Sequence, residues 1–275
     1  MKYTPRELEG NVNISRTSLI REFFFLLGSV LTLTLVVYVA LGLAVDLIVP
    51  GLSPEFEQRL GSLYGSTYTG TEETGAEKRL QQVLDSLSSV QPENKGWQYR
   101  VHLVQDKRIN TLALPGGHIV VYSGLLDEVE SENELAFVLA HELGHFAHRD
   151  HLRGLGRRLV LLAMVAPVFG QDSSISKFMS NSLLDVEMRF SQGQEKMADL
   201  WAVDLLNRKY GHAGGAVDFL DRIARKEKNG RLAYLFSTHP YPLNRVKALQ
   251  KYIMIRGYQV KEKIPLDGSL RRKSQ

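Results

Sequence analysis

The sequence predicts an α+β protein, in which a mostly helical domain with a small β-sheet follows one N-terminal transmembrane helix. The first observation is an uncharged apolar stretch over residues 23–45. The second is that apolar residues after position 75 recur mostly at helical spacing, as at Leu80, Val83, Leu84 and Leu87. Only residues 99–104 and 118–122 look like strands, so a single domain with a small sheet is the economical interpretation.

The stretch over residues 23–45 is long enough to cross a membrane. At about 1.5 Å per residue, a helix of this length exceeds a hydrocarbon core of about 30 Å. A cleaved signal peptide is the competing interpretation, because Gly42 and Ala44 resemble a small-x-small cleavage site. The long leader before Phe23 and the length of the apolar stretch favour an uncleaved anchor.

Basic residues flank this helix unequally. Four precede it and only Arg59 follows within twenty residues; the four are Lys2, Arg6, Arg16 and Arg21. The positive-inside rule then predicts a cytoplasmic tail over residues 1–22 and a domain on the other side of the membrane. Acidic residues make the leader a poor mitochondrial transit peptide, which favours a bacterial inner membrane with the domain in the periplasm; they are Glu7, Glu9 and Glu22.

The remaining chain divides into three predicted parts. Residues 46–74 form a juxtamembrane linker, flexible where Gly, Ser and Thr are frequent over 61–75. Residues 75–255 form the folded domain, and 256–275 a basic tail in which Arg271, Arg272 and Lys273 are solvated. The chain has no cysteine, which excludes disulfides and thiolate metal sites.

A metal-binding pentapeptide lies in the domain. His141 and His145 are four residues apart, so on a helix both imidazoles can bind one Zn²⁺, with Glu142 beside the metal as general base. Ser131 and Glu134 form a predicted capping box ahead of an apolar helical pattern. The pentapeptide is therefore expected in the middle of a helix.

A catalytic zinc site needs a third protein ligand. Glu195 is the best candidate, on a helix expected to end at Tyr210, and Asp199 lies one turn later, where it can accept the N–H of a ligating histidine. A solvated helix face is the alternative for these two carboxylates. His151 is a rival ligand, although His148 stands where the corresponding three-histidine motif has a glycine.

Several ordered motifs resemble a known family. They are residues 110–117 (NTLALPGG), 141–145 (HELGH), 195–199 (EKMAD) and 238–240 (THP), followed by Asn244 and Arg245. This order is similar to that of the zinc metallopeptidases that include the CAAX prenyl proteases, the heat-shock membrane protease HtpX and mitochondrial inner-membrane quality-control proteases. The similarity covers about residues 78–252. It implies a zincin-like fold.

The resemblance also implies residue roles. His141, His145 and Glu195 would bind one Zn²⁺ per chain, Glu142 would activate water, and His239 would stabilise the oxyanion. The stretch that begins at Asn110 looks like the family's edge strand, which takes up an extended substrate; the implied substrate-binding residues are Asn110, Leu114, Gly116, Gly117 and Arg245. Many relatives have Ser-Arg before the ligand glutamate, whereas this chain has Ser191 and Gln192, followed by Gly193.

A second apolar run covers residues 159–169, where multi-pass relatives carry membrane spans. Eleven residues are too few to cross a membrane. A core helix with a solvated basic end is the favoured interpretation, and a helix at the membrane surface is the alternative. In the second case Arg153, Arg157 and Arg158 would meet anionic headgroups.

The sequence thus predicts a membrane-anchored zinc metalloendopeptidase acting on envelope proteins, in protein quality control as the resemblance implies. Its partners would be protein or peptide substrates, membrane lipid through the N-terminal helix, and a second copy or envelope-assembly proteins. A net charge of +4 without a basic and aromatic ladder argues against nucleic acid. A membrane-tethered chaperone or assembly factor remains an alternative. Prenyl-peptide processing is disfavoured, because one span cannot build an intramembrane chamber.

Overall fold

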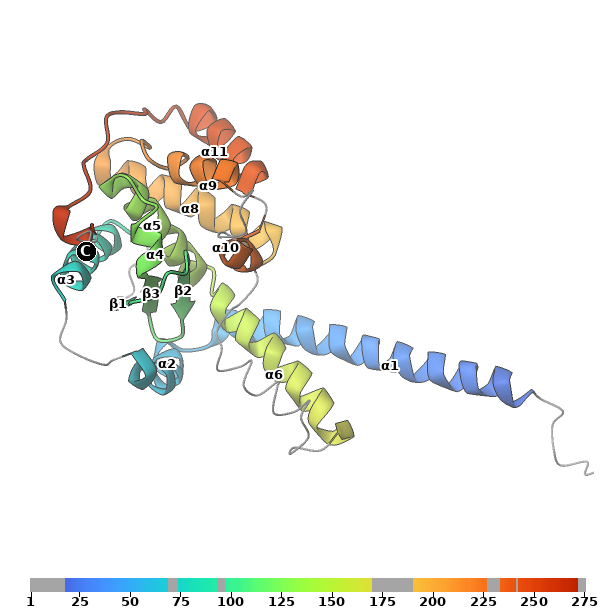
Figure 1. Ribbon diagram of the computed structural model, residues 1–275. Coiled ribbons are helices and arrows are strands. Elements are labelled where there is room, and N and C mark those ends of the chain that lie inside the picture. Colours follow the sequence, from blue (N-terminus) through green and yellow to red (C-terminus); the bar gives the residue numbers. More distant parts are fainter. Residues whose placement is uncertain are drawn as a thin grey trace, which may run out of the picture.

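The computed structural model describes residues 18–68, 74–92, 97–169, 190–226, 233–240 and 242–271. A long helix projects from a mostly helical domain that contains one small sheet (Figure 1). In chain order the elements are α1 Leu19–Ile48, η1 Val49–Gly51, α2 Pro54–Tyr68, α3 Gly75–Ser88, β1 Arg100–Val104, β2 Thr111–Leu114, β3 His118–Tyr122, α4 Ser123–Leu126, α5 Glu132–Ala147, α6 Asp150–Phe169, α8 Gln192–Tyr210, α9 Asp218–Lys226, α10 Ala233–Thr238, α11 Pro242–Arg256 and η3 Gly268–Leu270. The α+β class predicted from the sequence is confirmed.

Helix α1 contains the predicted apolar stretch and extends it at both ends. It has 30 residues, which corresponds to about 45 Å, and none of its side chains is buried. Among the described residues it is the one helix long and apolar enough to cross a membrane. Residues 1–17, with most of the charges on which the orientation was predicted, lie outside the described residues.

The predicted flexible linker is partly helical, because α2 continues through Gly61 to Tyr68. Ser53 supports the start of this helix by accepting a hydrogen bond from the N–H of Phe56. Gly61 serves a close approach: a methyl group there would lie 2.6 Å from the carbonyl oxygen of Pro115. Residues 61–68, predicted to be part of a flexible linker, are thus helical, and Gly61 lets α2 approach the turn between β2 and β3.

The sheet has three strands in the order β1-β3-β2. β1 pairs with β3 in parallel, and β3 pairs with β2 in an antiparallel hairpin whose turn holds Gly116 and Gly117, both at φ +83°. The predicted strands β1 and β3 are confirmed. The edge strand implied by the resemblance, from Asn110 through residues 118–122, is divided in two: β2 forms an edge of the sheet within the described residues, whereas β3 lies between β1 and β2.

Helices α5 and α8 pack closely against each other. A methyl group on Gly144 would lie 2.8 Å from the Cα of Ala198, so this contact requires glycine on α5. Ser131 caps α5 as predicted, but the Glu134 carboxylate accepts from the N–H of Glu130 and does not return to Ser131. The close contact brings the pentapeptide of α5 opposite the first turns of α8.

The segment after Arg256, predicted to be a basic tail, packs in part against the domain. Leu266 and Leu270 are buried in the main core, and Ile264 donates its N–H to the side-chain oxygen of Asn133. Arg271 is exposed, as predicted. Arg272 and Lys273 lie outside the described residues.

Candidate active site

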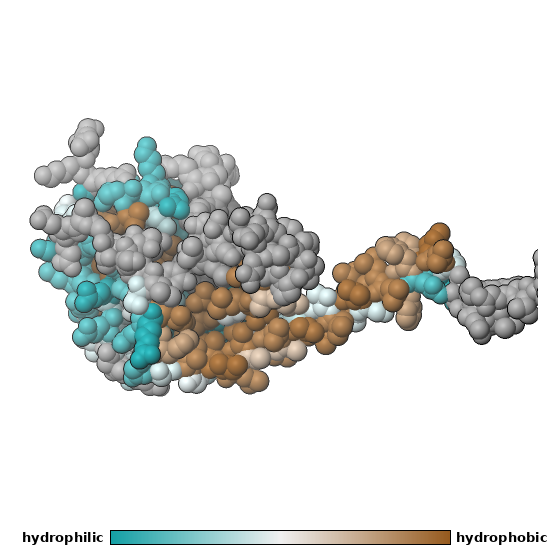
Figure 2. Space-filling view, turned by 90° about the horizontal axis from the view of Figure 1, so that it is seen from below, coloured by the Kyte–Doolittle hydropathy of each residue, from teal (hydrophilic) through white to brown (hydrophobic). Residues whose placement is uncertain are grey.

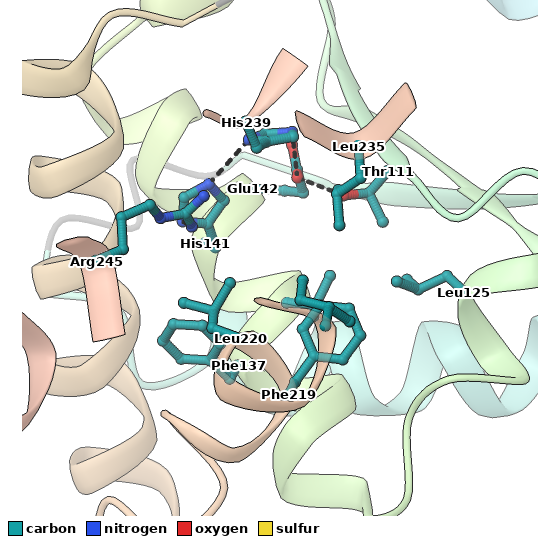
Figure 3. Close-up of a pocket in the computed structure, with 12 residues that line it drawn as sticks. Thr111, Leu125, Phe137, His141, Glu142, Phe219, Leu220, Leu235, His239 and Arg245 are labelled. Atoms are coloured by element: carbon teal, nitrogen blue, oxygen red, sulfur yellow. Dashed lines mark hydrogen bonds and ion pairs between the residues drawn. The ribbon is translucent and has the colours of Figure 1, made fainter. Parts of the chain in front are cut away.

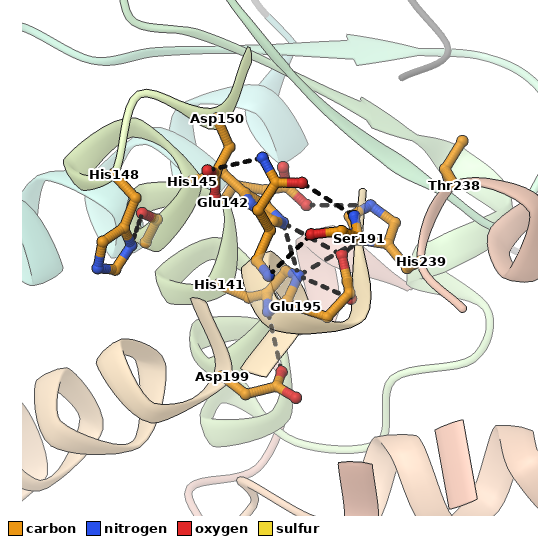
Figure 4. A network of polar contacts seen from close by, with 12 residues as sticks. His141, Glu142, His145, His148, Asp150, Ser191, Glu195, Asp199, Thr238 and His239 are labelled. Atoms are coloured by element: carbon orange, nitrogen blue, oxygen red, sulfur yellow. Dashed lines mark hydrogen bonds and ion pairs between the residues drawn. The ribbon is translucent and has the colours of Figure 1, made fainter. Parts of the chain in front are cut away.

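Three elements bring four buried side chains together. His141 and His145 come from α5, Glu195 from the first turn of α8, and His239 directly follows α10. One ligand atom from each lies within 4.8 Å of the others (Figure 4). His145 Nε2 is 3.4 Å from Glu195 Oε1, and His239 Nδ1 is 3.0 Å from the same oxygen. The sequence-predicted ligands therefore form a single cluster.

The hydrogen bonds of the two α5 histidines indicate what the cluster can hold. His141 Nδ1 is 3.0 Å from Asp199 Oδ1, and His145 Nδ1 is 2.9 Å from Asp150 Oδ2. An ionised carboxylate only accepts, so each Nδ1 carries a proton. The two Nε2 atoms then face each other at 3.1 Å. Only a positive charge, a proton or a metal ion, satisfies both, and these residues therefore fit a divalent cation.

Without a metal ion, a proton takes this place. Burial lowers the pKa of His145, but the hydrogen bond that its Nδ1–H donates to Asp150 and the contacts with Glu195 overcome burial and raise the pKa to about 9. For His141, burial dominates and lowers the pKa despite Glu195 and Asp199. A metal ion bound by the two Nε2 atoms would replace the proton that the raised pKa favours on His145.

Arg245 on α11 organises both carboxylates of α8. Its Nη1 is 2.5 Å from Glu195 Oε2, and Nε and Nη2 donate to the two oxygens of Asp199 at 2.8 and 2.7 Å. Burial raises the pKa of Glu195, but Arg245 together with the surrounding histidines outweighs burial and holds the pKa well below its usual range. Both carboxylates are therefore ionised, as metal ligation and histidine orientation require.

Glu142 lies beside the cluster with one oxygen held and one free. Thr111 Oγ donates to Glu142 Oε1 at 2.5 Å (Figure 3), whereas Oε2 is buried without a hydrogen-bond partner in the described chain. His239 Nε2 is 3.8 Å from Glu142 Oε1. Thr111 was missed from the sequence, although it follows the predicted Asn110. A carboxylate with one free oxygen can accept a proton.

An apolar wall borders this carboxylate. Figure 3 shows Phe137, Phe219 and Leu220 below Glu142, with Leu125 and Leu235 also on the pocket wall. The cavity between these side chains and the polar cluster measures about 30 Å³. That is room for roughly one or two water molecules, so a substrate side chain needs the wall to move.

The predicted substrate-binding residues are divided between two places. Asn110 is buried near the site and its Oδ1 accepts from Thr238, while Arg245 lines the pocket. Leu114, Gly116 and Gly117 lie at the other end of the hairpin and do not line the pocket. Leu114 belongs to the smaller hydrophobic cluster of the sheet.

The rival ligand lies elsewhere. His151 is buried, but its Nε2 is 2.7 Å from Glu57 Oε1 on α2, and it is not in the ligand cluster. His148 lies between exposed and buried, with Nδ1 2.8 Å from the carbonyl oxygen of Gly144. His151 therefore joins α6 to the juxtamembrane helix.

Three further residues of the site were missed. Asp150 orients His145, Gln194 donates to the other oxygen of Asp150 at 2.9 Å, and the Phe190 ring stacks on His145 at 3.7 Å between centroids. Gln194 also completes a capping box with Ser191, so α8 starts firmly despite Gly193. The one signal for Asp150 is its position just after the pentapeptide helix, which does not reveal that the chain turns there.

A helix that presents two oriented histidines and a glutamate to a carboxylate on a second helix defines the class of metallopeptidases. The family description that matches residues 75–253 is peptidase family M48, and the chain belongs to this family. The residues between α3 and α11 are thus the peptidase domain of that family.

Curated relatives agree with this class. The metalloprotease LoiP of Escherichia coli is 32% identical over 182 residues, which cover 63% of this chain and 69% of LoiP. The mitochondrial metalloendopeptidase OMA1 of Schizosaccharomyces pombe is 26% identical over 56% of this chain and 47% of its own length. A putative β-barrel assembly-enhancing protease of Vibrio cholerae is 28% identical over 52% of this chain. The chain spans only about a third (32%) of that protein's length.

Proposed function

We propose that this protein is a membrane-anchored zinc endopeptidase. The observation that carries the proposal is the pair of facing Nε2 atoms in His141 and His145, with Glu195 beside them and the free oxygen of Glu142 next to the cluster. Two imidazoles and one carboxylate are a common donor set of catalytic zinc. When bound, a zinc ion supplies Lewis acidity, which polarises the scissile carbonyl and lowers the pKa of water.

The chain's own residues would perform the remaining tasks. Glu142 accepts a proton from water and gives it to the leaving amine, while Thr111 keeps the other oxygen of this carboxylate occupied. His239 donates to the oxyanion of the tetrahedral intermediate. Asp199 and Asp150 hold the two histidines in the tautomer that frees Nε2.

The substrates would be extended segments of envelope proteins, cleaved in protein quality control. β2 is an edge strand in the described sheet and holds Glu142 through Thr111, so a strand added along this edge would pass the general base. The apolar wall with Phe137, Phe219 and Leu220 favours a large apolar side chain once it opens. The names of the β-barrel assembly-enhancing relatives support envelope proteins as partners.

We place the protein in a bacterial inner membrane, with α1 as a single span and the peptidase domain in the periplasm. The length and composition of α1 support the span, and the excess of basic residues before it supports the orientation. Protease added to spheroplasts should digest the domain and spare a tag before Met1. Digestion of the tag alone would reverse the orientation.

The central test replaces Glu142 by Gln in the full-length protein. The variant should lose hydrolysis of an unfolded protein substrate and keep about one zinc ion per chain, because Glu142 is the base and not a ligand. Glu262→Gln, an exposed residue of the C-terminal segment, is the matched control and should keep both. Loss of zinc or retained hydrolysis in the Glu142 variant would overturn the assigned role, and an envelope-assembly function that survives this substitution would favour a tethered chaperone.

A further inference from the structure

Helix α6 changes character along its length. Its first turns carry Arg153, Arg157 and Arg158, whereas residues 159–171 contain no charged residue. Helix α1 shows the opposite order, with an uncharged stretch over residues 23–45 followed by Asp46. α6 therefore passes from charged to apolar along the chain, and α1 passes from apolar to charged near its C-terminus, with Arg21 and Glu22 at its far end.

The charged ends of the two helices meet. Asp46 Oδ1 lies 3.2 Å from Arg153 Nη1, and Asp46 Oδ2 lies 2.8 Å from Arg157 Nη2. At the same level the helices touch, since a methyl group on Gly156 would lie 2.7 Å from a methyl carbon of Val45. We name Asp46, Arg153 and Arg157 the ion-pair collar.

From the collar, the apolar stretches of both helices run away from the peptidase domain. α1 runs outward toward its N-terminus and α6 runs outward toward Phe169, on the same side of the domain (Figure 1). Seen from below, hydrophobic side chains form a brown band that continues from the domain along the helical arm, while hydrophilic side chains gather over the domain (Figure 2). The collar thus lies at a boundary between polar and apolar surface.

The apolar end of α6 does not serve the domain core. No α6 residue belongs to the main hydrophobic core of the described chain, and Leu159 is 50% exposed. The favoured sequence interpretation, a core helix, was therefore wrong. None of residues 159–165 is buried, and apolar surface that moves from water into hydrocarbon gains free energy in proportion to its area.

We propose that α6 beyond Arg158 inserts into the same bilayer that α1 spans, with the ion-pair collar at the membrane surface. Residues 159–169 rise about 16 Å as a helix, so α6 reaches only about halfway through a core of about 30 Å. Arginines at the start of such a segment keep their charges in the headgroup region. The inference rests on the proposed span of α1 and is independent of the catalytic assignment.

The insertion fixes where the active site works. Asp150, which orients His145, is the first residue of α6, and Arg157 follows seven residues later, or about 10 Å along the helix. The site would be held close above the membrane surface. Substrate segments that emerge from the bilayer would then meet it before segments in bulk solution.

The absence of cysteine allows a direct test with single-cysteine variants of the full-length protein. Leu159→Cys and Leu162→Cys probe α6, Leu33→Cys probes the middle of α1, and Leu243→Cys is a matched exposed leucine on α11. Each variant carries a nitroxide label in vesicles of phosphatidylethanolamine and phosphatidylglycerol. Electron paramagnetic resonance then compares collisions with oxygen, which concentrates in lipid, and with a water-soluble nickel complex.

Labels at positions 159, 162 and 33 should collide preferentially with oxygen, and the label at 243 with nickel. If positions 159 and 162 behave like 243 while 33 reports lipid, the insertion is wrong and the anchor stands. Protection of 159 and 162 from both reagents would place α6 in protein contact and also overturn the inference. A label at 33 that meets nickel would overturn the anchor and the insertion together.

Discussion

The two α5 histidines are oriented in the same way by two very different parts of the molecule. Asp199 orients His141 from inside the domain, where buried Arg245 binds both of its oxygens. Asp150 orients His145 from the corner between α5 and α6, where it has Gln194 as a neutral partner. His141 is therefore positioned by the domain core and His145 by the corner between α5 and α6. We call His141 with Asp199 the core half of the site and His145 with Asp150 the corner half.

That corner is itself tied to the juxtamembrane segment. Arg149 has φ +55°, and its Nη1 donates to the carbonyl oxygens of Val49 and Leu52 at 2.9 and 2.6 Å. The position of Asp150, and with it the orientation of His145 in the corner half, thus depends on the segment that follows α1. The comparison teaches that two histidines equivalent in sequence can be positioned by different parts of the molecule, one by the domain core and one by a corner bonded to the segment that follows α1.

The largest expected effect comes from Glu195, which serves both halves. Glu195→Ala should weaken zinc binding well beyond the 10–100-fold typical of outer-shell partners, because it removes a ligand. His151→Gln keeps a donor for Glu57 and should change zinc affinity little. Competition with a chromophoric chelator measures both constants. The reverse ranking would make His151 the ligand, and the division of the site into a core half and a corner half would then be wrong.

His239 belongs to neither half, and its Nδ1 is 3.3 Å from His141 Nε2. His239→Gln should lower kcat by about 10²–10³-fold, as loss of an oxyanion donor does, with zinc affinity retained. Steady-state kinetics on a fluorogenic peptide and metal analysis separate the two readouts. A loss of zinc comparable to that of Glu195→Ala would instead make His239 a ligand.

Much of this site follows from the sequence, for a physical reason. Ligands at positions four apart on one helix, as in His141 and His145, are fixed by helical geometry alone. Glu195 and Asp199 lie one turn apart on a second helix, so a single close contact at Gly144 sets both at once. Local periodicity and one helix pair account for the cluster.

The missed residues depend on chain reversals that the sequence does not encode in a readable way. Asp150 reaches His145 because Arg149 adopts a left-handed backbone conformation, which a non-glycine residue rarely does. Thr111 reaches Glu142 because β2 is a separate edge strand against α5, and four buried residues give no alternation to reveal it. The positions of Asp150 and Thr111 are determined by tertiary contacts and not by local propensity, so a sequence pattern does not predict them.

The two orienting carboxylates provide a smaller, sharper test. Asp199→Asn and Asp150→Asn should each weaken zinc binding by about 10–100-fold. Their effects on stability should differ, because only Asp199 pairs with a buried arginine, and breaking such a pair costs about 3 kcal/mol or more. Urea unfolding of the metal-free variants measures this. Equal stabilities would show that the core half is no more rigid than the corner half.

The smallest expected effect tests the link between the corner and the anchor. Arg149→Gly keeps the left-handed backbone, which glycine adopts freely, and removes the bonds to Val49 and Leu52. Zinc affinity should fall by less than about tenfold, below the usual effect of an outer-shell partner, because the change acts through Asp150. Arg225→Gln, an exposed residue of α9, is the control and should leave zinc affinity unchanged.

A double-mutant cycle then decides whether Arg149→Gly changes zinc affinity through the corner half. Because Arg149 acts on zinc through Asp150, Arg149→Gly should add little in the Asp150→Asn background and its full effect in the Asp199→Asn background. Chelator competition on the parent protein, the three single variants and the two double variants supplies the coupling energies. Equal additivity in both backgrounds would show that Arg149 positions neither histidine in particular, and the two halves would then respond to the anchor alike.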